Sequence, residues 1–87
     1  MSFFIVDREV PDFTLDHLAA VQRAAVEESQ RFTGDGRPVR YVRSTFVPRE
    51  AHCMCLFEAD DASTVEALNH EARIPFTRIV EAIELAP

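Results

Sequence analysis

The chain has 87 residues, of which 47% are hydrophobic and 28% are charged, and its formal net charge is −6. Such a length suits one domain with a single core, which we expect to span residues 1–87. The acidic balance argues against a nucleic-acid partner, because phosphate binding draws its affinity from clustered basic residues. No apolar run approaches the ~20 residues of a membrane span. No secretory signal fits the N-terminus, so we expect a cytoplasmic protein with reduced cysteines and no membrane partner.

The first half of the chain predicts a strand, a helix and a second strand. Residues 2–8 are aromatic and β-branched, and Pro11 ends this strand because proline cannot donate to a ladder. Thr14 is the expected helix N-cap, and the glycines at 34 and 36 are expected to end the helix. Residues 38–47 form the next predicted strand. The helical apolar spacing runs through Leu15, Leu18, Val21, Ala25 and Phe32.

The second half repeats this pattern after a turn at residues 48–50. Residues 51–59 predict a strand, Asp60 or Asp61 caps a second helix, and Pro75 stops it. Residues 77–85 predict a final strand, although Ile79, Val80 and Ile83 also fit a helical period. The inward side of the second helix is expected to carry Ala62, Val65, Leu68 and Ala72.

The resulting order, β-α-β-β-α-β, predicts an α+β fold of the ferredoxin-like sandwich class. In this fold a four-stranded antiparallel sheet carries both helices on one face. Both faces of the first and third strands hold apolar residues, so the face without helices needs a cover. The simplest cover is a second copy of the sheet. We therefore expect a homodimer packed through the sheet face, an assembly of the dimeric α/β-barrel type.

The segment 51–60, AHCMCLFEAD, holds the residues with the most distinctive chemistry. Alternation along a strand places Cys53 and Cys55 on one face and His52 on the other. A disulfide between the two cysteines is not expected, because residues two apart in a strand have parallel rather than converging side chains. Free cysteines here can be small core hydrophobes, metal ligands or reactive thiols.

Four stretches of the chain resemble a family of small bacterial proteins of unknown function, some of which are described as nickel-binding. The resemblance implies a ferredoxin-like fold, a dimer and a bound divalent metal such as nickel. Cys55 matches the family's strand cysteine, and His70 is the histidine nearest to the one the family carries on its second helix. The matching stretches are FIVDREVP at 4–11, VRYVRSTFV at 39–47, CLFEADDASTVEALN at 55–69 and ARIPFTRIVEAIE at 72–84.

The candidate site residues fall into two sets. Thiolate and imidazole suit nickel, zinc or copper, so the metal candidates are Cys55, Cys53, His70 and His52. Polar residues near the central strands could instead form the floor of a small-molecule pocket. These pocket candidates are Asp7, Arg8, Tyr41, Arg43, Ser44 and Glu58.

The leading functional hypothesis is therefore a cytoplasmic protein that binds a divalent metal or a small ligand. The alternative is a cofactor-free oxygenase or isomerase of the dimeric α/β-barrel type that acts on a small aromatic compound. In that case Asp7, Arg43 or His52 would handle a proton. A third hypothesis is a structural interaction module with neither activity. The apolar wall of the enzyme's pocket would come from Phe4, Tyr41, Phe46 and Phe57.

Overall fold

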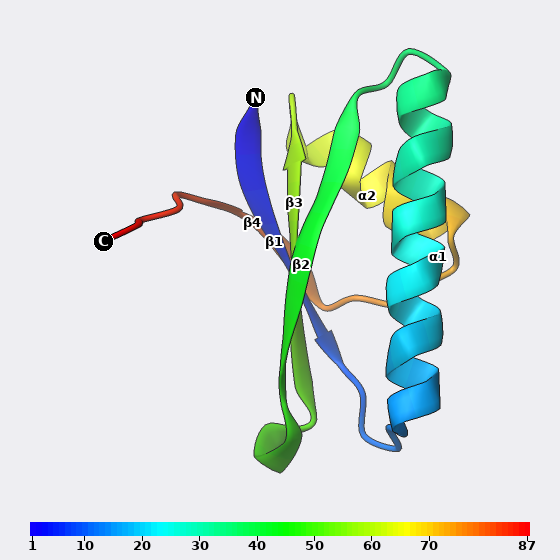
Figure 1. Cartoon of the computed structure of the whole chain (residues 1–87), viewed down its shortest axis with the longest axis vertical. Helices are drawn as coiled ribbons and strands as arrows, with labels where there is room; N and C mark the ends of the chain where they lie inside the picture. The colour runs from blue at the N-terminus through cyan, green and yellow to red at the C-terminus, as the bar shows by residue number, and fades with distance from the viewer.

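A computed structural model describes residues 1–87 and shows one antiparallel sheet with the strand order β2-β3-β1-β4. Both helices lie on the same face of this sheet (Figure 1). This arrangement confirms the ferredoxin-like α+β fold. The elements in chain order are β1 (Ser2–Glu9), α1 (Leu15–Gly34), β2 (Val39–Val47), the 3₁₀ turn η1 (Pro48–Glu50), β3 (His52–Ala59), α2 (Ala62–Glu71) and β4 (Arg78–Ala82).

The helix ends are fixed by capping side chains. The Thr14 hydroxyl accepts a hydrogen bond from the His17 amide at 3.0 Å, which satisfies one free donor at the start of α1. Asp61, rather than Asp60, caps α2 by accepting from the Thr64 amide at 2.9 Å. Beyond the end of α1 the chain turns through Gly36, whose φ of 86° favours glycine.

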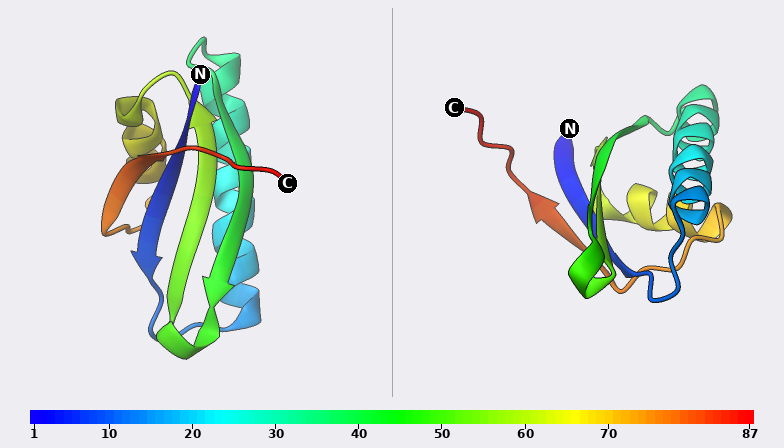
Figure 2. Two further views of the ribbon diagram at one scale, coloured as in Figure 1. Left: turned by 90° about the vertical axis from the view of Figure 1, so that its left-hand side faces the viewer. Right: turned by 60° about the horizontal axis from the view of Figure 1, so that its bottom comes forward.

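The C-terminal segment is a strand, as the alternation favours, but it is shorter than residues 77–85. β4 pairs with β1 only from Arg78 to Ala82. The residues after β4 extend away from the sheet on the side opposite the helices (Figure 2). Ile83 and Leu85 are 82% and 91% exposed there. A helix at this position is therefore wrong, and the apolar residues after Ala82 do not contribute to the core.

β2 contains a bulge that strict alternation does not predict. Tyr41 pairs with Phe57, but the next pair is Arg43 with Leu56, so Val42 is an extra residue. The bulge reverses the alternation of the rest of the strand. Ser44 consequently faces the helices beside Cys55, and Arg43 faces the opposite side of the sheet.

The core lies between the sheet and the helices, and α1 covers it unevenly. Ala25 and Phe32, in the C-terminal half of α1, are fully buried. Leu18 and Val21 are only half-buried, and Leu15, expected to join the buried stripe, is 80% exposed. The N-terminal half of α1 therefore packs loosely on the sheet. The other fully buried large side chains are Phe57, Leu68, Val6, Val65, Asn69 and Cys55.

Candidate functional site

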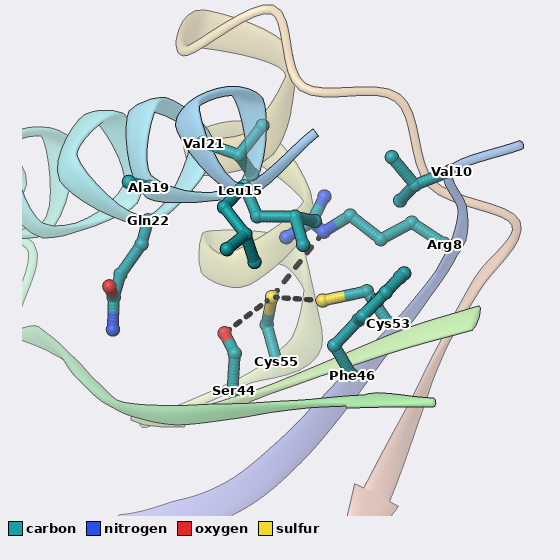
Figure 3. A pocket seen from close by; sticks show the side chains of 11 residues that line it. Arg8, Val10, Leu15, Ala19, Val21, Gln22, Ser44, Phe46, Cys53 and Cys55 are labelled. Carbon is teal, nitrogen blue, oxygen red and sulfur yellow. Dashed lines mark hydrogen bonds between the residues drawn. The ribbon is translucent and has the colours of Figure 1, made fainter. Parts of the chain in front are cut away.

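A cavity of about 290 Å³ lies between the N-terminal half of α1 and the sheet face that the helices cover. Its floor comes from β1, β2 and β3, and its wall from α1 (Figure 3). Most of the lining is apolar, which suits a small ligand more than a hydrated ion. The lining residues are Arg8, Val10, Leu15, Leu18, Ala19, Val21, Gln22, Ser44, Phe46, Cys53 and Cys55.

The sulfur of Cys55 is the centre of the polar floor. It accepts hydrogen bonds from Arg8 Nε at 3.4 Å and from the Ser44 hydroxyl at 3.0 Å. The Cys53 sulfur lies 3.9 Å away on the same face of β3, and both thiols are free. The three contacts, which Figure 3 shows as dashed lines, come from β1, β2 and β3, so pairing of the central strands fixes the geometry of the group.

Arg8 is only 2% exposed and makes all of its polar contacts inside the protein. Its Nη2 donates to Asn69 Oδ1 at 2.9 Å, and its Nη1 donates to the carbonyl of Pro75 at 3.2 Å. No carboxylate oxygen lies within 4.0 Å of the guanidinium. A buried cation needs a compensating anion, and Cys55 is the one acidic group among its contacts.

The electrostatics of the two cysteines reflect this arrangement. A hydrogen bond from Cys53, the charge of Arg8 and the hydroxyl of Ser44 lower the pKa of Cys55, against the opposing effect of burial. The hydrogen bond to Cys55 and burial raise the pKa of Cys53. Cys55 is therefore the thiolate of the pair, and Cys53 is the thiol that donates to it. This separation is typical of a reactive cysteine with a neutral neighbour.

A chain of hydroxyl and amide groups connects Cys55 with the protein surface. Ser44 donates to Cys55 and accepts from the Tyr41 hydroxyl at 2.6 Å. Tyr41 in turn accepts from the exposed side chain of Gln22 at 3.1 Å. Neither Gln22 nor Asn69 was among the sequence candidates, because each enters the site only through packing of its helix on the sheet.

The four metal candidates are not brought together. Cys53 and Cys55 lie side by side, but His52 projects from the other face of β3. His70 lies on the exposed side of α2, where its Nε2 is 3.6 Å from Glu66 and its ring packs against Phe76. No group of three or more histidine, cysteine or carboxylate side chains in the chain is arranged so that it could hold one metal ion.

A second polar cluster occupies the sheet face without helices. Asp7 is buried and accepts from His52 Nε2 at 3.1 Å and from Arg78 Nε at 2.6 Å. The other ring nitrogen of His52 is 3.1 Å from Glu9. The hydrogen bond with Glu9, supported by Asp7, raises the pKa of His52. The two carboxylates meet opposite edges of the ring, so they hold the imidazole rather than enclose an ion.

The remaining pocket candidates are divided between the two faces. Arg8, Tyr41 and Ser44 belong to the covered face. Arg43 pairs with Glu84 at 2.5 Å, and Arg40 Nη2 pairs with Glu58 at 3.0 Å, both away from the cavity. The sheet therefore separates Asp7, Arg43 and Glu58 from Arg8, Tyr41 and Ser44, so the six residues do not share one face.

The pocket expected for the oxygenase is not assembled either. Phe4 and Phe57 are core residues, and of the four aromatic candidates Phe46 alone lines the cavity. The groups expected to move a proton, Asp7, Arg43 and His52, lie across the sheet from it.

The fold and the site define a small ferredoxin-like protein with a buried thiol in a partly apolar cavity. A family model described as "Nickel responsive protein SCO4226-like" matches residues 4–82. The chain belongs to this SCO4226-like family, as the resemblance implies. No curated protein matches the chain.

Among solved structures, the chain is similar to SCO4226 from Streptomyces coelicolor A3(2), with a TM-score of 0.82 and 19% sequence identity. The alignment covers 98% of this chain and 100% of that one. At this identity the likeness shows the shared fold.

The residues of this chain do not fit a complete nickel site. The sulfur separation of 3.9 Å would let Cys53 and Cys55 contact one ion, since metal–sulfur bonds are about 2.3 Å long. The guanidinium of Arg8, however, touches Cys55 and would repel a dication bound there. His52 projects from the opposite face of the sheet, and His70, on α2, lies beside Glu66 and Phe76, so no imidazole completes the set.

The lowered pKa of Cys55 predicts an unusual pH dependence of alkylation by iodoacetamide. In wild-type protein, with the label on Cys55 followed by mass spectrometry of peptides, we expect the rate to change little between about pH 9 and about pH 7, because the hydrogen bond from Cys53, Arg8 and Ser44 keep Cys55 a thiolate throughout this range. In the protein unfolded in urea, the alkylation rate of the same thiol should fall roughly 20-fold from about pH 9 to about pH 7, as it does for an ordinary thiol with a pKa of about 8.5. Parallel profiles for the folded and unfolded protein would contradict the assignment.

Proposed function

We propose that this protein binds a small, largely apolar molecule in the cavity beneath α1, with a polar atom of the ligand at the Arg8–Cys55 floor. The observation that carries the proposal is a buried guanidinium hydrogen-bonded to a buried cysteine sulfur at the bottom of a mostly apolar cavity. A core that needed only stability would fill this volume with side chains, because unfilled space and buried charge are both costly.

The cavity's shape and charge indicate the chemistry of the ligand. Leu18, Val21 and Phe46 offer an apolar wall, and Ser44 and Gln22 offer hydrogen-bonding groups. The charge of Arg8 is already balanced by Cys55, so a neutral hydrogen-bonding head group is favoured over a carboxylate. A free, reduced thiol at this position also supports the cytoplasmic location proposed from the sequence. Neither helix combines the length and the hydropathy that a membrane span requires.

A substitution at the mouth of the cavity tests ligand binding. Ala19 and Ala20 are both exposed, but Ala19 lines the cavity and Ala20 does not. Titration of 1-hexanol, used as a neutral apolar probe, should shift the NMR resonances of the cavity residues in wild-type protein and in the Ala20→Trp control. Ala19→Trp fills the mouth and should weaken binding about tenfold or more, equivalent to about 1.4 kcal/mol. Equal responses of the two variants, or no response in wild type, would contradict the proposal.

Nickel binding is the second candidate, and the description of the family favours it. The cavity offers two sulfurs beside a fixed cation, so we infer that a nickel ion would use donors other than Cys55. Calorimetric titration of Ni²⁺ should therefore give the same affinity for wild-type and Cys55→Ala protein. A loss of nickel binding in Cys55→Ala would return the two cysteines to the role of ligands.

We also propose that the protein forms a homodimer through the sheet face without helices. Apolar side chains on this face support it: cross-strand pairs place Ile5 beside both Leu56 and Val80, and Val80 is 36% exposed. The segment after β4 extends on the same side of the sheet (Figure 2), and its exposed Ile83 and Leu85 would enlarge the buried area.

The mass in solution tests this assembly. Light scattering should give the mass of two chains for wild type and of one chain for Val80→Glu, because a carboxylate within the interface would be buried without a partner. Ala20→Glu places the same charge on the exposed side of α1 and should remain dimeric. A wild-type mass of one chain would refute the dimer.

A further inference from the structure

The contacts of Cys55 also have the composition of a redox site. A guanidinium, a hydroxyl and a second thiol lie within 3.9 Å of the Cys55 sulfur. The cation and the hydroxyl both donate hydrogen bonds to the sulfur, so they favour its ionised form. The thiolate is the form of cysteine that attacks electrophiles, including peroxides.

The charge balance of the interior provides an independent reason for an anionic sulfur. Arg8 is 2% exposed, its other partners are the neutral Asn69 amide oxygen and the Pro75 carbonyl, and no carboxylate compensates it. A neutral Cys55 would leave an isolated cation in the core, which is strongly unfavourable. The fold therefore keeps the sulfur charged, and hence nucleophilic, whether or not a ligand occupies the cavity.

The Cys55 sulfur is shielded from bulk solvent, but a small molecule can reach it through the cavity. Cys55 is 2% exposed at the protein surface, yet both cysteines line the cavity of about 290 Å³. A molecule as small as hydrogen peroxide can enter such a volume, whereas a protein thiol cannot. The geometry thus selects small oxidants and excludes disulfide exchange with other proteins.

We propose that Cys55 is a redox-active cysteine that a small hydroperoxide oxidises to sulfenic acid. The Cys55 sulfur forms a bond with one peroxide oxygen and the oxygen–oxygen bond breaks. The sulfur gives up two electrons, and the departing oxygen leaves with the bonding pair. For hydrogen peroxide the departing group is hydroxide, which takes one proton from the buffered solvent, so the thiolate, one hydrogen peroxide and one proton yield one sulfenic acid and one water. Arg8 and Ser44 are positioned to donate hydrogen bonds to the oxygens as negative charge passes from sulfur to the leaving group.

The position of Cys53 determines the fate of the oxidised sulfur. Its thiol lies 3.9 Å from Cys55, and a disulfide would require the sulfurs to approach to about 2.05 Å. The backbone ladders of β3 on both sides hold the two residues in an extended strand. We therefore expect the sulfenic acid to persist long enough to be trapped chemically.

Because the chain has only two cysteines, single substitutions give proteins with one thiol each. Folded Cys53→Ala protein, which keeps Cys55, should react with hydrogen peroxide and then with dimedone at neutral pH at least tenfold faster than Cys55→Ala protein. The same Cys53→Ala protein unfolded in urea should lose this advantage, since Arg8 and Ser44 no longer contact the sulfur. Ser44→Ala should slow the folded reaction several-fold.

Wild-type protein provides the same answer without a substitution that could disturb folding. After brief peroxide treatment, mass spectrometry of peptides should place the dimedone label on Cys55. Label on Cys53 alone, no label, or equal rates for folded and unfolded Cys53→Ala protein would overturn the proposal. Hydrogen peroxide needs none of the apolar wall, so this result is independent of whether hexanol binds.

Discussion

The buried guanidinium of Arg8 is the interaction on which the site depends. Its three hydrogen bonds reach β3 at Cys55, α2 at Asn69 and the α2–β4 connection at Pro75. An arginine cannot shed its charge at any ordinary pH. The fold must therefore supply an anion in the interior, and the sulfur that does so becomes a reactive group. The contact between Arg8 and Cys55 thus both stabilises the buried cation and activates the thiol.

The central strand β1 carries two opposite charges at adjacent positions. Alternation sends Asp7 to the face without helices and Arg8 to the covered face, so the two side chains cannot neutralise each other. Each finds partners on its own face: His52 and Arg78 surround Asp7, and Cys55 contacts Arg8. The backbone carbonyl of Asp7 also accepts from the amide and hydroxyl of Thr77, which holds the entry to β4 in place.

The periodicities predict the element order and the fold class, because each helix and strand carries its own apolar pattern and capping residues. Strand alternation also correctly separates His52 from the two cysteines. Two features of the site lie beyond such reasoning. The bulge at Val42 has no sequence signal, yet it decides that Ser44 rather than Arg43 meets Cys55. The contact between Arg8 and Cys55 joins residues 47 positions apart, so it emerges only when β1 and β3 pair in register.

Chemical modification of Cys55 should have different consequences for the fold according to the charge that it leaves behind. Alkylation makes the sulfur neutral and leaves Arg8 as an uncompensated cation in the core, a situation that typically costs about 3–5 kcal/mol. Oxidation of Cys55 leaves a sulfenic acid, whose S–OH group can still lose its proton and carry negative charge beside the guanidinium. The same ion pair that makes the thiol nucleophilic therefore favours modifications that preserve an anion. The cavity beneath α1 provides the volume in which the added oxygen can be accommodated without displacing the helix.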